Sequence, residues 1–295
     1  MYSRRYSRRD FGKMALASVP LARAISAVNV GGVAIGVQTY SYRALPHGKL
    51  DDVDVILGAL KTDDAGEVEL YSPGIEPPSA PGRDNRESLR QWRLSMPTDH
   101  FAAVGQKFKD SGVTIHSYTM NYRSDFTDEE IDKTFDQAKA LGTNIIASST
   151  QVSMAKRLLA FAEKRKMLLA FHGHSNTKDA NEFATPESFQ SALDLSKYAR
   201  INLDIGHFSA AGYDPVAFIE QHHASITHLH LKDRKNNDGA NVPWGEGDTP
   251  IKGVLLLLKE KKYPIPAFVE YEYRGTGTPI EEVKKCLDYM RAVLA

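Results

Sequence analysis

The sequence predicts a single (β/α)₈ barrel, because short apolar segments and longer helical segments alternate eight times along the chain. After a leading segment, about 270 of the 295 residues remain, which is an ordinary length for one such barrel. An open doubly wound sheet would normally carry a glycine-rich phosphate loop after its first strand, whereas Gly31 and Gly32 precede the first apolar segment. A closed barrel is therefore favoured over an open sheet.

Eight β-rich segments recur about every 30 residues. Their Val, Ile, Leu and aromatic content is typical of strands that are buried on both faces. The predicted strands are Val33–Tyr42, Glu67–Tyr71, Val113–Tyr118, Asn144–Ser148, Met167–Phe171, Ile201–Ile205, Ile226–Leu231 and Ile265–Tyr271.

A helical segment follows each predicted strand. Thr127 precedes three acidic residues, and Pro186 and Pro215 stand at first helical positions, which favours helix starts there. Gly112 and Gly142 stand where helices should end. The predicted helices are 50–62, 98–110, 127–141, 153–166, 186–199, 214–223, 250–261 and 279–294.

Two strand-to-helix connections, 72–97 and 233–249, are longer than the others. Connections of this kind lie at the catalytic face of a barrel. We therefore expect each of them to form a lid or to line a substrate cleft, or else to be a passive surface insertion.

Composition excludes several classes of function. Lys plus Arg and Asp plus Glu balance at 37 each, so the chain has no overall positive field to attract nucleic acid. No segment has the roughly 20 apolar residues needed to span a bilayer, so we expect a protein that is not membrane-embedded. The single cysteine, Cys286, is expected to be a buried core thiol. The oligomeric state stays open.

The N-terminal segment resembles an export signal. It reads Ser7-Arg8-Arg9-Asp10-Phe11-Gly12-Lys13 and is followed by a weakly apolar run, as in bacterial twin-arginine signals. The alternative is a basic tail that binds an acidic partner. We expect residues 1–30 to be an export signal and linker, residues 31–295 to form the barrel domain, and the protein to be periplasmic.

Imidazoles and carboxylates gather at the ends of the predicted strands. Side chains alternate along a strand, so His228 and His230 should share one face, as should Glu270 and Glu272. These faces would converge on His172 and Asp204, and two imidazoles with two carboxylates suit one divalent ion, either Mn²⁺, Zn²⁺, Co²⁺ or Mg²⁺. The residues of this kind in the strand-end zone are Glu69, His116, His172, His174, Asp204, His207, His228, His230, Glu270 and Glu272.

Three segments resemble the xylose-isomerase-like superfamily of sugar isomerases and epimerases. They are Asn202-Leu203-Asp204-Ile205-Gly206-His207, His228-Leu229-His230-Leu231-Lys232-Asp233 and Phe268-Val269-Glu270-Tyr271-Glu272. The resemblance implies a metal site with four ligands, one from each of strands five to eight. Asp204, His230 and Glu270 match the last three ligands. The first is normally a glutamate, and this chain has His172-Gly173-His174 there.

The resemblance also implies chemistry at a carbon next to a carbonyl. In the epimerases, glutamates on strands five and eight transfer protons on opposite sides of the substrate carbon. With His172 in the first position, Glu270 remains as a base, and His116, Lys232 or Glu272 are candidates for a second group. We expect Glu270, Lys232 and His116 to be catalytic, and substrate to be bound by Glu69, His174, His207, Glu272 and Trp244.

The expected partner is a small sugar, and nucleic acid is not expected. Three alternatives to a sugar isomerase or epimerase differ in their chemistry. A lyase or hydratase acting on 3-keto-glycosides would use the same metal site and one base. A non-catalytic sugar-binding barrel would need no metal. DNA repair, by analogy with endonuclease IV, is disfavoured by the neutral charge and by the resemblance to an export signal.

Overall fold

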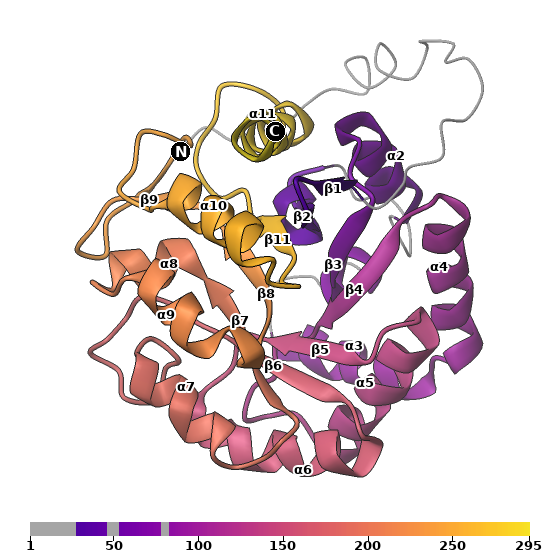
Figure 1. Ribbon diagram of the computed structural model, residues 1–295. Coiled ribbons are helices and arrows are strands. Elements are labelled where there is room, and N and C mark those ends of the chain that lie inside the picture. Colours follow the sequence, from indigo (N-terminus) through magenta and orange to yellow (C-terminus); the bar gives the residue numbers. More distant parts are fainter. Residues whose placement is uncertain (1–27, 46–52, 78–82) are drawn as a thin grey trace, which may run out of the picture.

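The computed structural model describes residues 28–45, 53–77 and 83–295, and in it eight parallel strands close into a barrel (Figure 1). The first and second barrel strands pair through Val37 with Val68 and Gln38 with Glu69, which closes the sheet. The predicted fold class is confirmed. The barrel strands are β2 (Val33–Gln38), β3 (Glu67–Tyr71), β4 (Thr114–Thr119), β5 (Ile145–Ser148), β6 (Leu168–His172), β7 (Ala199–Asp204), β8 (Ile226–Leu231) and β11 (Ala267–Val269).

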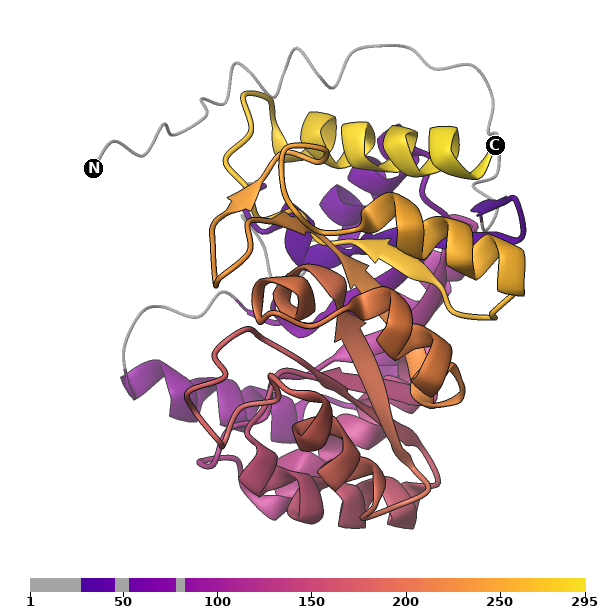
Figure 2. The same cartoon turned by 60° about the vertical axis from the view of Figure 1, so that its left-hand side comes forward.

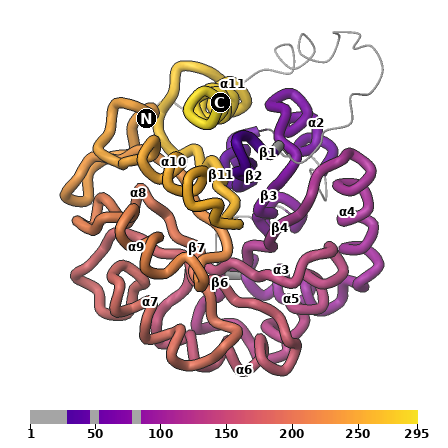
Figure 3. The backbone as a smooth tube through the Cα atoms, viewed as in Figure 1, coloured from indigo at the N-terminus to yellow at the C-terminus, as the bar shows by residue number. Residues whose placement is uncertain are grey.

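Helices surround the strands, and the chain runs once around the barrel, so that the last helix lies beside the first described one (Figure 3). The predicted caps are present: Thr127 accepts a hydrogen bond from the backbone N–H of Glu130, and Gly142 ends its helix in the left-handed conformation. The helices are α2 (Val53–Asp63), α3 (Arg83–Ser95), α4 (Thr98–Asp110), α5 (Asp128–Leu141), α6 (Ala155–Arg165), α7 (Pro186–Leu193), α8 (Ile205–Ala210), α9 (Pro215–His222), α10 (Ile251–Lys261) and α11 (Pro279–Leu294).

A short strand, β1 (Val28–Val30), pairs antiparallel with β2. The last residues of the segment predicted as signal and linker therefore take part in the sheet, while the twin-arginine motif at residues 7–13 lies outside the described residues. Among the helices that the structure describes, none combines the length and the apolar character that crossing a membrane requires.

The connection 72–97, predicted as a loop, contains helix α3. Sequence patterning does not indicate this helix, because α3 is rich in charge and has few apolar residues. Trp92 of α3 packs edge-to-face on Phe101, and the other contacts are ionic: Arg93 forms a two-pronged ion pair with Glu76, and Arg86 and Arg93 both bind Glu130, which is fully buried on α5. In Figure 2, α3 and the loop that carries β9 (Asp233–Arg234) and β10 (Asn241–Val242) project on the same side of the barrel.

Several predicted strands and helices end earlier in the structure. β2 ends at Gln38 and continues as a 3₁₀ turn over Thr39–Tyr42, and α7 ends at Leu193 rather than at residue 199. β11 covers only Ala267–Val269, and Pro266 before it has no N–H to donate to a neighbouring strand. Ile205, predicted as the end of a strand, begins α8 because the Asp204 carboxylate accepts a hydrogen bond from the backbone N–H of His207.

The two faces of the strands bury different chemistry. Alternation places Val68, Leu203 and Leu229 on the outer face, where they are buried with the apolar side chains of the helices. Inside the barrel, the neighbouring residues Glu69, Asn202 and His228 are fully buried, and Glu69 contacts both of the others. The barrel interior therefore carries a polar layer directly below the ends of the strands.

Candidate active site

A solvent-open cavity of about 180 Å³ lies at the carboxyl ends of the barrel strands. Its walls are made almost entirely of polar and aromatic side chains that stand at the end of a strand or just after one. Such a cavity suits a small, hydrogen-bonding ligand. It is lined by Gln38, Tyr40, Glu69, Tyr71, Thr119, Asn121, Ser149, His172, His174, His207, His230, Lys232, Glu270 and Glu272.

Four potential metal ligands meet at the base of this cavity. His172 and Asp204 are the last residues of β6 and β7, His230 lies on β8, and Glu270 directly follows β11. One donor atom from each of the four lies within 4.8 Å of all the others, and all four residues are buried. The structure thus brings together the four side chains that the sequence predicts as metal ligands.

The donor set fits a divalent ion on three observations. His172 Nδ1 is buried without a hydrogen-bond partner among the described residues. His230 Nδ1 and Glu270 Oε2 are 3.2 Å apart, close to the roughly 3.4 Å expected for two tetrahedral ligands about 2.1 Å from one ion. The other ring nitrogen of His230 lies 3.1 Å from Glu69 Oε2, and a carboxylate in that place orients a metal-binding imidazole.

Glu69 is the centre of the polar layer below the ligands. Its carboxylate accepts hydrogen bonds from Gln38, Ser117, Thr119 and Asn202, and it contacts both His228 and His230. Although burial opposes it, the two histidines lower the pKa of Glu69 well below its usual value. Glu69 is therefore a buried, fully partnered carboxylate at the floor of the cavity.

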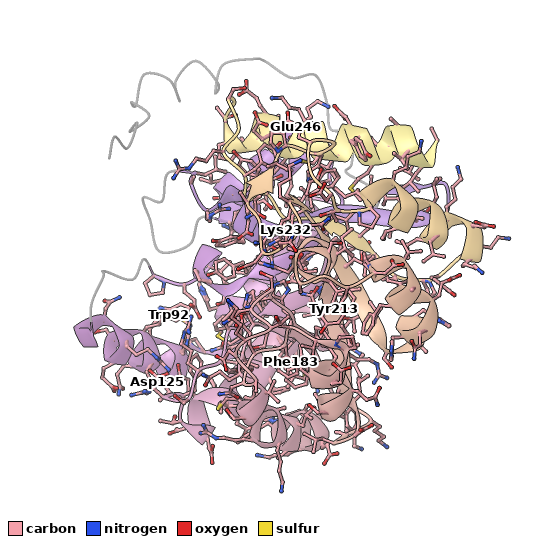
Figure 4. All side chains as sticks on the ribbon, turned by 90° about the vertical axis from the view of Figure 1, so that its left-hand side faces the viewer. Trp92, Asp125, Phe183, Tyr213, Lys232 and Glu246 are labelled. Carbon is pink, nitrogen blue, oxygen red and sulfur yellow. The ribbon has the colours of Figure 1, made fainter. Side chains whose placement is uncertain are left out.

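Lys232 brings a buried ammonium group into the same place. Its Nζ lies 3.0 Å from Asp204 Oδ2, 2.7 Å from Glu270 Oε2 and 2.5 Å from Glu272 Oε2. Burial alone would lower the pKa of Lys232, but these carboxylates outweigh it and raise that pKa above the usual value. Lys232 is buried, and Figure 4 shows it near the middle of the view, with Glu246 at the level of α11.

Burial and the neighbouring charges shift the pKa values of the proposed ligands. Burial raises the pKa of Asp204 to about 7, although the Lys232 ammonium opposes the shift. Burial also disfavours a charged His230, yet the carboxylates of Glu69 and Glu270 outweigh it and raise the pKa of His230 to about 10. The Lys232 and His230 charges hold the pKa of Glu270 well below its ordinary value against the effect of burial.

Comparison with known protein families identifies the family of this chain. The sequence matches the family described as xylose isomerase-like TIM barrel over residues 73–293. The chain belongs to this family. The matched region contains all four of the clustered donor residues.

Individual relatives of this xylose isomerase-like barrel are more distant. An L-ribulose-5-phosphate 3-epimerase from Salmonella paratyphi C is 32% identical over 92 residues, and the match covers 31% of this chain and 32% of the epimerase. A solved sugar phosphate isomerase/epimerase from Parabacteroides distasonis has a TM-score of 0.62 at 19% identity, covering 88% of this chain and 97% of the other. The IOLI protein, solved with a bound zinc atom, has a TM-score of 0.62 at 14% identity, covering 88% and 99%.

Most of the other predicted site residues line the cavity of this xylose isomerase-like barrel. Glu69 forms its floor, the rings of His174 and His207 lie with their centroids 5.1 Å apart, and Lys232 forms an ion pair with Glu272. Burial lowers the pKa of His172, His174 and His207, which favours neutral rings. The prediction that these side chains converge is therefore matched by the geometry, while their individual roles stay predictions.

Two predicted site residues lie elsewhere. His116 is below the cavity, where its ring packs against His228 and Phe268 and its Nδ1 lies 3.2 Å from Glu67. Trp244 packs edge-to-face on Tyr289 of α11, and its indole N–H is buried without a partner among the described residues. Neither side chain lines the cavity. A residue's place in a strand does not tell how deep in the barrel its side chain lies, and a residue's place in a loop does not tell which way its side chain points.

Several cavity residues were not singled out from the sequence. Tyr40 and Tyr71 form an edge-to-face pair with ring centroids 5.2 Å apart, and Asn121 and Ser149 follow β4 and β5. Tyr71 is the last residue of β3, and the other three stand one or two residues past a strand, so the same strand-end rule that selected the histidines could have found them. Single tyrosine, asparagine and serine residues carry no distinctive spacing, however, and they do not stand out from the sequence without the fold.

Proposed function

We propose that this protein is a metal-dependent enzyme that removes a proton from the carbon next to a carbonyl group of a sugar or keto-sugar, with isomerisation as the leading reaction. The single observation that carries the proposal is the buried group of four donors, His172, Asp204, His230 and Glu270, at the base of a polar cavity. The family membership and the zinc-bound structural neighbour support it.

The same four side chains would hold the ion, with Glu69 orienting His230 from below. When bound, a divalent ion supplies Lewis-acid polarisation of a substrate oxygen. His172 and His230 contribute nitrogen, and Asp204 and Glu270 contribute oxygen. This mixed set suits Mn²⁺, Zn²⁺, Co²⁺ or Mg²⁺ and differs from the all-oxygen set typical of Ca²⁺.

Glu270 is the proposed base. Its Oε2 contacts His230 and Lys232, whereas Oε1 makes no hydrogen bond among the described residues and remains available for a substrate proton. The low pKa of Glu270 keeps the carboxylate ionised. As the C–H bond breaks, its electron pair moves toward the carbonyl oxygen, and the buried Lys232 ammonium is suited to stabilise the negative charge that develops there.

The remaining walls suit a polyhydroxylated substrate. Gln38, Asn121 and Ser149 offer amide and hydroxyl groups that can donate to or accept from sugar hydroxyls. The rings of Tyr40 and Tyr71 supply an aromatic surface for the apolar side of a sugar ring. The proposed substrate is therefore a free sugar, keto-sugar or glycoside that is small enough for the cavity.

The proposal is tested by screening the full chain, loaded with each of the four metals, against aldoses, ketoses and 3-keto-glycosides. We expect a metal-dependent isomer or an elimination product from at least one class, and no product after chelation. An Asp132→Ala variant, which loses an ion pair between α5 and Arg165 of α6, is the matched control and should keep full activity. Sugar binding without any conversion would contradict the proposal and favour a non-catalytic sugar-binding barrel.

We also propose that residues 1–30 direct export to the periplasm by the twin-arginine route. The Ser7–Lys13 motif supports this. Fractionation of a bacterial host should place the processed protein in the periplasm, and replacing Arg8 and Arg9 with lysine should retain it in the cytoplasm. Equal export of the two forms would refute the proposal.

A further inference from the structure

Three imidazoles stand together at the wall of the cavity: His172, which is also one of the four clustered ligands, and His174 and His207. His172, His174 and His207 each place a ring nitrogen within 4.8 Å of the others, a spacing that can hold a metal ion. Their hydrogen-bond partners are very different, however, and a neutral imidazole carries its proton on only one nitrogen. The partners therefore decide what each ring offers to a ligand in the cavity.

Arg234 determines the form of His207. The guanidinium group has five N–H donors and no acceptor, and its Nη1 lies 2.6 Å from His207 Nδ1. The second Nη1 hydrogen goes to Ser175 Oγ at 2.8 Å, and Nε and Nη2 donate to the Gly239 carbonyl oxygen and to Asp238. All five donors are thus directed at acceptors, so His207 Nδ1 must accept, and the proton of the neutral ring must be on Nε2.

Ser175 does not change this assignment. Its hydroxyl has one hydrogen, which it donates to Asp238 Oδ1 at 2.6 Å. Ser175 Oγ is 3.4 Å from His207 Nδ1, so it offers that nitrogen no hydrogen of its own. Arg234 is therefore the only donor to His207 Nδ1 among the described residues.

His174 has the opposite partner. Its Nδ1 lies 2.9 Å from Glu182 Oε1, and an ionised carboxylate can only accept, so Nδ1 carries the proton. The unprotonated Nε2 then faces Ser149 Oγ at 3.2 Å, on the wall of the cavity. Backbone contacts hold both residues of this pair in place. The His174 backbone N–H donates to the Phe183 carbonyl oxygen, and Glu182 forms a β-bridge with Gln151.

We propose that Glu182 and Arg234 are positioning residues that hold His174 and His207 in opposite tautomers, so that the cavity presents one imidazole acceptor and one imidazole donor to its ligand. Building on the proposed function, this selects a substrate that places a hydroxyl group at His174 and a carbonyl or other acceptor oxygen at His207. An α-hydroxy-carbonyl sugar has both groups on neighbouring carbons.

The same assignment excludes a second metal ion on the three histidines. Coordination through His207 Nε2 would require the proton to move to Nδ1, where it would face the Arg234 donor at 2.6 Å. Of the two groups that share His172, only the group of four ligands then binds an ion. The protein is expected to hold one equivalent of metal rather than two.

The direct test is long-range ¹H–¹⁵N NMR of the full chain labelled with ¹⁵N-histidine, recorded both metal-free and with Zn²⁺ bound. The signals of His174 and His207 are assigned by their loss in single replacements with glutamine, or with asparagine where the glutamine variant does not fold. We expect the N–H of His174 on Nδ1 and that of His207 on Nε2. The same tautomer in both rings, or a doubly protonated ring at neutral pH, would overturn the proposal.

Two variants and a control separate positioning from general stability. Arg234→Lys should release the tautomer preference of His207 alone, and Glu182→Ala that of His174 alone. Glu220→Ala, which removes a surface ion pair with Lys261, should change neither ring. A response of both rings to each variant would overturn the proposal, because it would indicate a general loosening of the wall rather than two separate contacts.

Two further readouts distinguish this proposal from the proposed function. Zinc titration should reach one equivalent, and two equivalents would overturn the tautomer assignment while leaving the enzyme class intact. On any substrate found by screening, Arg234→Lys should lower kcat/KM by about tenfold, mainly through KM, as expected for one lost hydrogen bond. A failed screen would refute the proposed function but would leave the NMR result valid.

Discussion

Two buried carboxylates in neighbouring layers of the barrel, Glu69 in the floor and Asp204 in the ligand group above it, have opposite surroundings. Both are at most 1% exposed. Glu69 accepts from four protein side chains and contacts two histidines, and its pKa is lowered. Asp204 accepts one backbone hydrogen bond, its Oδ2 has an ion pair but no hydrogen bond among the described residues, and its pKa is raised to about 7.

The comparison distinguishes a fully partnered buried acid from the acid that we propose as a metal ligand. Burying a carboxylate is costly unless donors or a cation compensate for the lost water. The protein supplies those donors to Glu69, whereas it leaves Asp204 and its neighbour His172 with atoms that have no hydrogen-bond partner. An incompletely partnered carboxylate beside an unpartnered imidazole is what a metal site offers its ion.

Replacing Asp204 tests most strongly whether this acid, unlike Glu69, binds a metal ion. We expect protein purified without chelator to hold about one equivalent of divalent metal, as a single catalytic site should, and Asp204→Ala to hold almost none, because one of the two carboxylate ligands is gone. Elemental analysis measures this directly. Full metal occupancy in Asp204→Ala would show that the ion, if present, is bound elsewhere.

Changing the floor should affect stability more than it affects metal content. Glu69→Gln places an amide among side chains that donate to Glu69, and removing one charge from such a buried group costs about 3–5 kcal/mol of unfolding free energy. Metal affinity should fall by roughly 10–100-fold through the loss of the His230 contact. Urea unfolding and metal titration measure the two effects. A Glu69→Gln protein as stable as the native one would remove the distinction between the layers.

A third buried carboxyl, Asp63, tests whether the number of donors sets the pKa. Asp63 lies far from the cavity in α2, accepts one hydrogen bond from the Tyr42 hydroxyl at 2.6 Å, and has an unpartnered Oδ1; burial raises its pKa to about 7. A pKa raised by folding means that the native state binds the proton more tightly. The contribution of Asp63 to stability is therefore full below pH 4 and is lost as the pH rises through 7.

The size of this effect is up to about 4 kcal/mol over that pH range, given about 1.4 kcal/mol for each pKa unit. We expect native protein to lose stability relative to Asp63→Asn between pH 4 and pH 7, as measured by urea unfolding at each pH. Comparison with the variant removes the opposite contribution of carboxyls such as Glu69. Parallel pH profiles of the two proteins would contradict the account of buried carboxyls.

Much of the fold was predictable from local sequence. Strand runs of Val, Ile and Leu followed by proline and threonine helix starts gave the eight units, because buried parallel strands and capped helices have strong compositional signals. Helix α3 was not predictable in this way, since its Arg86 and Arg93 are satisfied by Glu76 and Glu130 from other elements. The short helix α8 was hidden because Asp204 serves both as a strand residue and as a helix cap.

The convergence of the four proposed ligands was predictable from the sequence, but the depth and hydrogen bonding of the site were not. Alternation correctly placed His228 and His230 on one face, yet only the structure shows that His228 is sealed against Glu69 while His230 lines the cavity. The contacts of Glu182 with His174 and of Arg234 with His207, on which the tautomer proposal rests, join residues 8 and 27 positions apart in the sequence. No local spacing in the sequence encodes such contacts.

The central claim is one-base proton removal by Glu270 beside a bound metal. The most direct test incubates metal-loaded protein with an accepted substrate in D₂O and follows the carbon next to the carbonyl by NMR, in native protein and in Glu270→Gln with its metal content verified. We predict metal-dependent deuterium incorporation with isomerisation or elimination in the native protein, and a loss of about 10²–10⁴-fold in the variant. Undiminished turnover in metal-loaded Glu270→Gln, or exchange leading mainly to a C3 or C4 epimer, would contradict the account.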